Sequence, residues 1–134
     1  MIYQLNKISD RPCMPCASAR DVAGFAKEFL PLDKEAAYAV HLTPNKTLKG
    51  YVQADEKDPD RLIVPALLTG TSSIVIVLSR PKAANPFPSK EDIDNLHRLR
   101  SALYAFSIKI IDCVIIAKDS FYSFAEETLS VYEE

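Results

Sequence analysis

The sequence lacks the features that would place it in a membrane, export it or mark it as a nucleic-acid-binding protein. No apolar run is long enough to cross a bilayer, and the first ten residues, MIYQLNKISD, lack the charged and then apolar layout of a signal peptide. Lysine and arginine number 16 against 18 acidic residues, so the formal net charge is −2 and there is no basic excess. These absences favour a cytoplasmic protein.

Cysteines are few, and repeats are absent. Three cysteines, an odd number without an export signal, argue for reduced thiols rather than a disulfide framework. No internal repeat or low-complexity segment is visible, and 134 residues is the size of one domain with one core. The composition, 48% hydrophobic and 25% charged, is that of an ordinary soluble globular protein. We therefore expect residues 1–134 to form a single domain.

The chain is organised around residues 72–92, which contain a strand, a proline-rich loop and the start of a helix. Residues 74–78 form a continuous run of isoleucine, valine and leucine, which predicts a central strand buried on both faces. Ser89 and Asp92 have the S-x-x-D spacing of a capping box, which begins the next helix. Junctions of this kind are where α/β folds place their functional sites.

This stretch resembles the RadC-like branch of the JAMM (MPN/JAB) metalloprotein family. That branch has a strand ending in H-N-H-P-S-G and then a loop that reads N-P-x-P-S-x-x-D, and residues 85–92 match the loop without a gap. The two zinc-binding histidines would fall at Ser79 and Pro81. Sliding the register by one residue, to align the motif proline, places them at Leu78 and Arg80 instead. Neither register contains a histidine.

The resemblance covers residues 18–124 and leaves residues 125–134 as a tail. Glu35 lies seven residues before a leucine, which is the spacing that opens a hairpin in RadC-like proteins, where the glutamate is the general base. Residues of a later apolar run resemble the family's I-x-L-L-D-H-I-I-I-G, with Asp112 kept and Cys113 in place of the histidine.

The hydrophobic periodicity and the resemblance together predict a three-layer α/β fold of the MPN/JAB type, with a central mixed sheet and about three helices. Pro65 lies inside the second expected helix, where RadC-like proteins often carry a proline. The expected helices cover residues 18–30, 58–70 and 90–106, and the expected strands cover residues 2–8, 35–42, 47–54, 74–78, 107–117 and 120–124. The apolar stripe of the third helix should consist of Ile93, Leu96, Leu99, Leu103 and Phe106. The tail should be a short helix or frayed.

Zinc hydrolysis in this family needs two imidazoles and one carboxylate around the metal, an open position for water, and a glutamate to accept the proton of that water. The resemblance assigns the carboxylate to Asp92 and the proton acceptor to Glu35, with Ser89 as the supporting hydroxyl. Asp92 is also fully explained as a helix-capping residue, which is the interpretation we favour. Glu35 is either a vestigial general base or a strand-end glutamate in solvent. We expect no bound zinc, and a vestigial site that consists of Ser79, Pro81, Ser89 and Asp92.

The cysteines offer a second, weaker candidate for a metal site. Cys13 and Cys16 form a lone C-x-x-C, without a second ligand pair or the βαβ context of a redox motif. Cys113, His41 and His97 could complete a site, although nothing in their spacing joins them to the pair. The simpler interpretation is two loop thiols, one core cysteine and two ordinary surface or hydrogen-bonded histidines.

We therefore interpret the chain as a RadC-like domain that has lost its metal site and acts as a non-catalytic interaction or regulatory module for an unknown protein partner. The resemblance implies a bacterial protein with a link, by name, to DNA repair. Two alternatives stay open: a zinc hydrolase or isopeptidase with substituted ligands such as Cys113, and a nucleic-acid-binding accessory protein that uses Arg80, Lys82 and Lys90. Whether the chain forms a homodimer is also open.

Overall fold

The structure is a computed structural model that describes residues 18–54, 60–83, 85–118, 120–126 and 128–131. The strand expected at residues 2–8, the loop before residue 18, and both Cys13 and Cys16 lie outside these residues. Within the described ranges, no helix has the length and apolar character that a membrane span requires.

Three helices and six strands follow one another along the described chain. The helices are α1 (Ala19–Phe29), α2 (Asp60–Thr69) and α3 (Lys90–Tyr104). The strands are β1 (Ala36–Leu42), β2 (Leu48–Ala54), β3 (Ser73–Ser79), β4 (Lys109–Ile116), β5 (Ser120–Ser123) and β6 (Thr128–Val131). Every element expected between residues 18 and 124 is present, and the ends differ from the expected ones by at most two residues.

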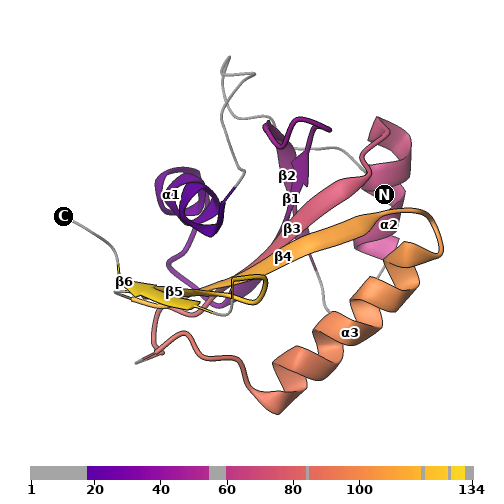
Figure 1. Ribbon diagram of the computed structural model, residues 1–134. Helices are drawn as coiled ribbons and strands as arrows, with labels where there is room; N and C mark the ends of the chain where they lie inside the picture. Colours follow the sequence, from indigo (N-terminus) through magenta and orange to yellow (C-terminus); the bar gives the residue numbers. More distant parts are fainter. Residues whose placement is uncertain (1–17, 55–59, 84, 119, 127, 132–134) are drawn as a thin grey trace.

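The six strands form one mixed sheet in the order β2-β1-β3-β4-β5-β6. β3 and β4 run parallel, whereas the other neighbouring strands run antiparallel. Figure 1 shows α1 on one side of the sheet, and α2 and α3 on the other. This arrangement of helix, sheet and helices confirms the predicted three-layer α/β fold.

β3 is buried on both faces because each face of the sheet has its own apolar core. Ile74 and Ile76 belong to the core under α2 and α3, whereas Val75 and Val77 belong to the core under α1. None of these four side chains is more than 2% exposed. Successive side chains of a strand point to opposite faces, so a continuous apolar run is what a strand between two helix layers requires. The predicted central strand is confirmed.

The apolar stripe of α3 is shorter than expected. Three of the five expected residues are buried: Leu96, Leu99 and Leu103. Ile93 is 38% exposed because it lies in the first turns of the helix, which project beyond the sheet in Figure 1. Phe106 is 48% exposed because the helix has already ended at Tyr104, and the chain reverses at Ser107, where φ is +59°.

The tail contains a strand rather than a helix. Thr128–Val131 form β6, which pairs antiparallel with β5 and places Thr128 opposite Ser123. The expectation of a short helix or a frayed segment is therefore wrong for these residues. Four residues give too short an alternation for a sequence pattern to identify, and the strand depends on β5 for its hydrogen bonds.

Among the strands that the structure describes, β2 lies at an edge of the sheet, and a bulge interrupts its pairing with β1. The neighbouring residues Leu42 and His41 of β1 pair with Leu48 and Gly50 of β2. Lys49 is therefore an extra residue on β2. The Lys49 ammonium donates a hydrogen bond to the backbone carbonyl oxygen of Thr69, in the last turn of α2. Helix α2 has no basic residue in its own last turn, so a lysine from the bulge supplies the cation that a helix C-terminus favours.

Candidate functional site

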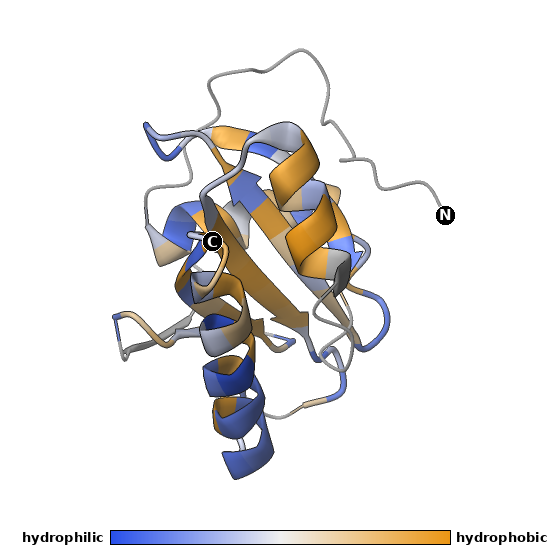
Figure 2. Cartoon of the chain, turned by 90° about the vertical axis from the view of Figure 1, so that its right-hand side faces the viewer, coloured by the Kyte–Doolittle hydropathy of each residue, from blue (hydrophilic) through white to orange (hydrophobic). Residues whose placement is uncertain are grey.

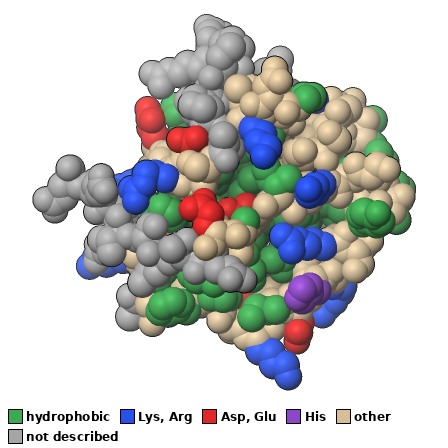
Figure 3. All heavy atoms as spheres, viewed as in Figure 1, with side chains coloured by type: hydrophobic (Ala, Val, Ile, Leu, Met, Phe, Trp, Pro, Cys, Tyr) green, Lys and Arg blue, Asp and Glu red, His purple; other side chains and the backbone are tan. Residues whose placement is uncertain are grey.

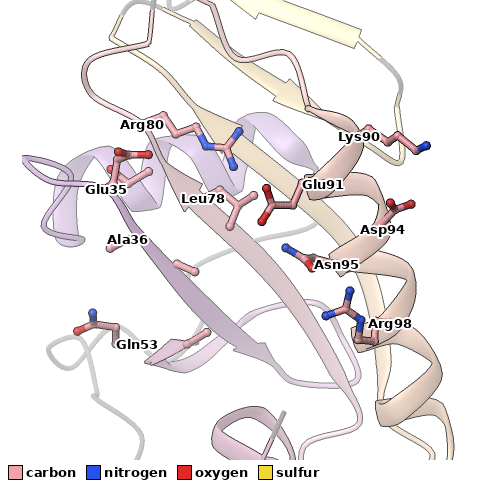
Figure 4. Close-up of a pocket in the computed structure, with 13 residues that line it drawn as sticks. Glu35, Ala36, Gln53, Leu78, Arg80, Lys90, Glu91, Asp94, Asn95 and Arg98 are labelled. Carbon is pink, nitrogen blue, oxygen red and sulfur yellow. The ribbon is translucent and has the colours of Figure 1, made fainter. Parts of the chain in front are cut away.

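A groove of about 940 Å³ lies at the end of the sheet where β1 begins and β3 ends. The N-terminal half of α3 forms one wall, so the groove adjoins the loop that matches the family motif (Figure 4). Its charged lining consists of Glu35, Arg80, Lys90, Glu91, Asp94 and Arg98. Both signs of charge are present, and alanines from β1 and β2 line it as well.

The motif loop ends in the predicted capping box at the start of α3. The Ser89 hydroxyl oxygen accepts a hydrogen bond from the Asp92 backbone amide at 3.1 Å, and an Asp92 carboxylate oxygen accepts one from the Ser89 backbone amide at 2.8 Å. These reciprocal bonds occupy backbone donors that a helix start leaves without a partner. Asp92 therefore has a structural role as a capping residue.

Arg80, the first residue after β3, binds the same carboxylate with both of its terminal nitrogens. Nη1 donates to Oδ2 of Asp92 at 2.5 Å, and Nη2 donates to Oδ1. The Asp92 side chain is 6% exposed and the Arg80 side chain 24%, so the pair is largely shielded from water. The hydrogen bond from Arg80 lowers the pKa of Asp92, and the Ser89 backbone amide adds to this, although burial acts in the opposite direction.

Strand alternation directs Ser79 away from this pair. The Ser79 hydroxyl donates to the Leu32 carbonyl oxygen at 3.3 Å, next to the α1 layer. Leu78 belongs to the core under α2 and α3, and Arg80 reaches towards α3 (Figure 4). Because Arg80 binds Asp92, these two residues share the side of the sheet on which Asp92 lies. The structure thus places Asp92 on the same side of the sheet as Leu78 and Arg80, the two positions of the alternative register, and not with Ser79.

The other expected site residues line the groove or lie in the turn that follows β3. Glu35 is exposed just before β1 and lines the groove. Pro81 lies in the turn that follows β3, and Lys82 is exposed in the same turn. Lys90 is exposed and points away from Arg80 in Figure 4. Of the three cations considered for nucleic-acid binding, Arg80 is already paired with a carboxylate.

The residues around Asp92 do not fit a zinc ion of the family's kind. Such a site needs three ligands that donate a lone pair, whereas Leu78 is aliphatic and the Arg80 guanidinium has donors only and keeps its charge. Both carboxylate oxygens of Asp92 already accept hydrogen bonds from Arg80. In the part of the chain that the structure describes, no group of three or more histidine, cysteine, aspartate or glutamate side chains could hold a metal ion.

Cys113 and the two histidines are not brought together. Cys113 is 2% exposed in the core under α2 and α3, as expected for a core residue, and His97 is exposed on α3. His41 differs from its expectation because it is fully buried, and neither ring nitrogen has a hydrogen-bond partner among the described residues. Burial and, to a smaller extent, the positive charge of Lys49 together lower the pKa of His41 to about 4.

A second buried carboxylate, Asp112, holds the turn after β5. One oxygen accepts hydrogen bonds from the backbone amides of Cys113 at 2.7 Å and Ala125 at 2.9 Å, and the other accepts one from the Ser123 hydroxyl at 2.7 Å. The Ser123 oxygen in turn accepts a hydrogen bond from the Glu126 amide at 3.1 Å. The residue that resembles the family's aspartate in β4 thus fixes strand β5 and its turn to β4.

Sequence reasoning missed Arg80 as the partner of Asp92. The sequence placed Arg80 only at one of the alternative histidine positions and among the three cations considered for nucleic-acid binding. One signal was available: in a strand whose residues alternate between two cores, position 80 shares a face with positions 76 and 78, and that face is the one that the helix after the loop must cover.

Comparison with known proteins gives an independent view of this chain. A model of the RadC-like JAB domain family matches residues 18–129. A UPF0758 protein of Geotalea uraniireducens is 32% identical over 109 residues, covering 76% of this chain and 47% of that protein. The UPF0758 protein of Thermotoga maritima is 25% identical over 117 residues, covering 82% of this chain and 52% of its own.

A UPF0758 protein of Clostridium perfringens is 26% identical over 136 residues, covering 96% of this chain and 60% of its own. The chain thus spans about half the length of the curated relatives that it matches. The family match covers both the groove and the Arg80–Asp92 pair, and extends five residues past Phe124 into β6. The chain belongs to the RadC-like JAB domain family.

Proposed function

We propose that this RadC-like domain is a non-catalytic interaction or regulatory module in which Arg80 takes the place of the metal ion. The observation that carries the proposal is the two-point contact between the Arg80 guanidinium and the Asp92 carboxylate. In intact family members that carboxylate is the metal ligand on the helix, as the resemblance implies. Here its negative charge is balanced by a side chain of the same protein.

An arginine in place of the metal ion can stabilise the fold but cannot activate water. A metal ion activates water because it has an open coordination position and lowers the pKa of the bound water. A guanidinium has neither property, since it offers only N–H donors and does not release a proton near neutral pH. Glu35 on the groove wall then has no activated water from which to take a proton, and the pair fastens the end of β3 to the start of α3.

The groove remains available for recognition after the metal site is lost. Its lining combines carboxylates, guanidinium groups and the amides of Gln53 and Asn95, which are side chains that bind polar backbone or charged groups of another molecule. A regulatory or adaptor role needs such a surface but no turnover. The connection to DNA repair is carried over from the family alone.

Metal content and hydrolysis test this proposal directly. Protein purified without chelator should carry far less than one zinc per chain by elemental analysis, and should not hydrolyse isopeptide or peptide substrates. Arg80→Ala, which frees the Asp92 carboxylate, should stay below one zinc per chain because the imidazoles are still missing. One tightly held zinc per chain in the native protein, lost on Cys113→Ala, would overturn the proposal in favour of a hydrolase with substituted ligands.

A further inference from the structure

Strand alternation points the His41 side chain towards the layer that contains α2. Ala39, two residues before it in β1, belongs to the core under α2 and α3, whereas Val40 belongs to the core under α1. Within the sheet, His41 pairs with Gly50 of β2 on one side and with Ile74 of β3 on the other. The imidazole therefore lies between the sheet and the helices.

Helix α2 covers this part of the sheet. It packs against β2, and Figure 2 shows it as the mainly orange helix at upper right, apart from the mainly blue α3. Its last turn lies near His41, because Lys49, which comes between the β2 partners of Leu42 and His41, donates a hydrogen bond to the Thr69 carbonyl oxygen. His41 is fully buried, whereas the histidine that Figure 3 shows at the surface lies over α3.

The elements packed around His41 offer it no carboxylate among their described side chains. β2 contributes Lys49, a cation, and β1, β3 and the described side chains of α2 contain no acidic group. Glu91, Asp94 and Arg98 of α3 line the groove, at the end of the sheet where β1 begins, whereas His41 lies near the end of β1. Neither ring nitrogen has a hydrogen-bond partner among the described residues. A proton on the buried ring would therefore lie near a cation and without a counter-ion.

We propose that proton uptake by His41 releases α2 from the sheet while the strands, α1 and α3 stay folded. A charged imidazole has to reach water, and α2 is the cover that can leave most easily. Side-chain packing and the Lys49 bond hold it to the sheet, whereas backbone ladders hold β2 and β3 to β1. Pro65 inside α2 also lacks the N–H of a helical hydrogen bond. The proposal goes beyond the proposed function and does not rest on it, since neither the groove nor the Arg80–Asp92 pair takes part.

The opening of α2 depends on pH because the open form binds the proton first. The pKa of His41 is about 4 in the closed protein and about 6.5 once the ring is in water. Between pH 7 and pH 5 the ratio of open to closed molecules should therefore rise about twentyfold. Opening uncovers the inner face of α2, including Leu62 and Ala66, which are fully buried in the closed protein. Helix α2 thus acts as an acid-sensitive cover over one side of the core.

Native-state hydrogen exchange of the full-length chain, followed by NMR at pH 7 and pH 5 in low concentrations of urea, tests the proposal. Each exchange rate is divided by that of the unprotected amide at the same pH. The protection of the amides of residues 66–69 in α2 should fall about twentyfold at pH 5. It should depend on urea much less than the protection of the β3 amides, because a local opening exposes little surface. At both pH values the β3 amides should stay at least about tenfold more protected than those of α2.

Variants of the two histidines assign the pH dependence to one ring. His41→Leu and His41→Gln both remove the titrating group, so the protection of α2 should change by less than about twofold between pH 7 and pH 5 in whichever of them folds. His97→Gln removes the exposed histidine of α3 and should keep the twentyfold change. Equal protection and equal urea dependence of α2 and β3, a pH dependence that persists without His41, or an α2 protection that is the same at pH 7 and pH 5 would each overturn the proposal.

Discussion

The Arg80 guanidinium and the Asp92 carboxylate face one another with both nitrogens and both oxygens engaged, so the pair forms two hydrogen bonds in parallel. Arg80 follows the central strand, and Asp92 lies in the first turn of α3. The pair therefore bridges the two walls of the groove and closes the loop between them. Such two-point contacts fix the relative orientation of the groups as well as their distance.

Arg80→Ala should destabilise the fold by about 1–3 kcal/mol, because it leaves a nearly buried carboxylate with only its capping bonds. It should also raise the pKa of Asp92, which the carboxyl carbon signal in an NMR titration reports directly. A lowered folded-state pKa contributes stability above the unfolded value of 3.8, and this contribution is lost as the pH falls through the folded value. The native protein should therefore keep this stabilisation down to a lower pH than Arg80→Ala does.

The control for this change is Arg98→Ala, which removes an exposed arginine that also lines the groove. It should change the free energy of unfolding by less than about 0.5 kcal/mol. Equal effects of the two substitutions would show that the Arg80–Asp92 contact does not hold the loop to α3 in solution.

Zinc binding should be restored by Leu78→His combined with Arg80→His. Side chains two residues apart on an extended segment leave the same face, and positions 78 and 80 face Asp92. The double variant should take up about one zinc per chain by elemental analysis, and Asp92→Ala should weaken that binding again. Ser79→His with Pro81→His, the pair that the ungapped register suggests, should bind zinc poorly because Ser79 points towards Leu32. A better result for this second pair would contradict the geometry described here.

His41 should make the protein less stable in mild acid. Its pKa is about 4 in the folded protein and about 6.5 in an unfolded chain, so as the pH falls the unfolded state binds the proton first. Stability should decrease between pH 6.5 and pH 4, by up to about 3 kcal/mol for a pKa difference of about 2.5. Urea unfolding at pH 7 and pH 4.5 measures this loss.

His41→Leu should remove most of that pH dependence without lowering stability at pH 7, because the two ring nitrogens have no hydrogen bonds to lose among the described residues. His97→Gln, at an exposed position of α3, is the matched control and should unfold like the native protein at both pH values. A large loss of stability in His41→Leu at pH 7 would indicate a polar partner for the imidazole.

Asp112→Ala should destabilise the protein by about 2–4 kcal/mol, since it removes the acceptor of three hydrogen bonds and leaves the Cys113 and Ala125 amides and the Ser123 hydroxyl to find others. Amide hydrogen exchange at Ala125 should become faster, because its donor loses a 2.9 Å bond. Asp94→Ala removes an exposed carboxylate and should leave both quantities nearly unchanged.

The sequence was sufficient for the layers of this fold because they depend on local patterns. The apolar run from position 74 to 78 predicted the central strand, and the S-x-x-D spacing predicted the start of α3 at the correct residue. Patterns failed where the outcome depended on distant parts of the chain. Whether Phe106 is covered depends on where α3 ends relative to the sheet, and β6 forms only because β5 offers it an edge.

The candidate site shows the same division. The capping bonds between Ser89 and Asp92 follow from a spacing of three residues and were predicted. The Arg80–Asp92 contact spans twelve residues and a loop, so no local periodicity encodes it. His41 was expected to be exposed or hydrogen-bonded, because polar side chains usually are, and only the packing of α2 over β1 and β2 reveals its burial.

The bulge at Lys49 has a consequence for how the molecule meets copies of itself. The free side of an edge strand presents backbone N–H and C=O groups to which a strand of another molecule can add. The extra residue between Leu48 and Gly50 breaks the regular spacing of these groups within a strand of only seven residues. A chain that adds to this edge can form continuous hydrogen bonds over a few residues only. Among the described strands, the bulge that brings Lys49 to the end of α2 thus also makes the outer edge of β2 a poor template for the addition of another strand.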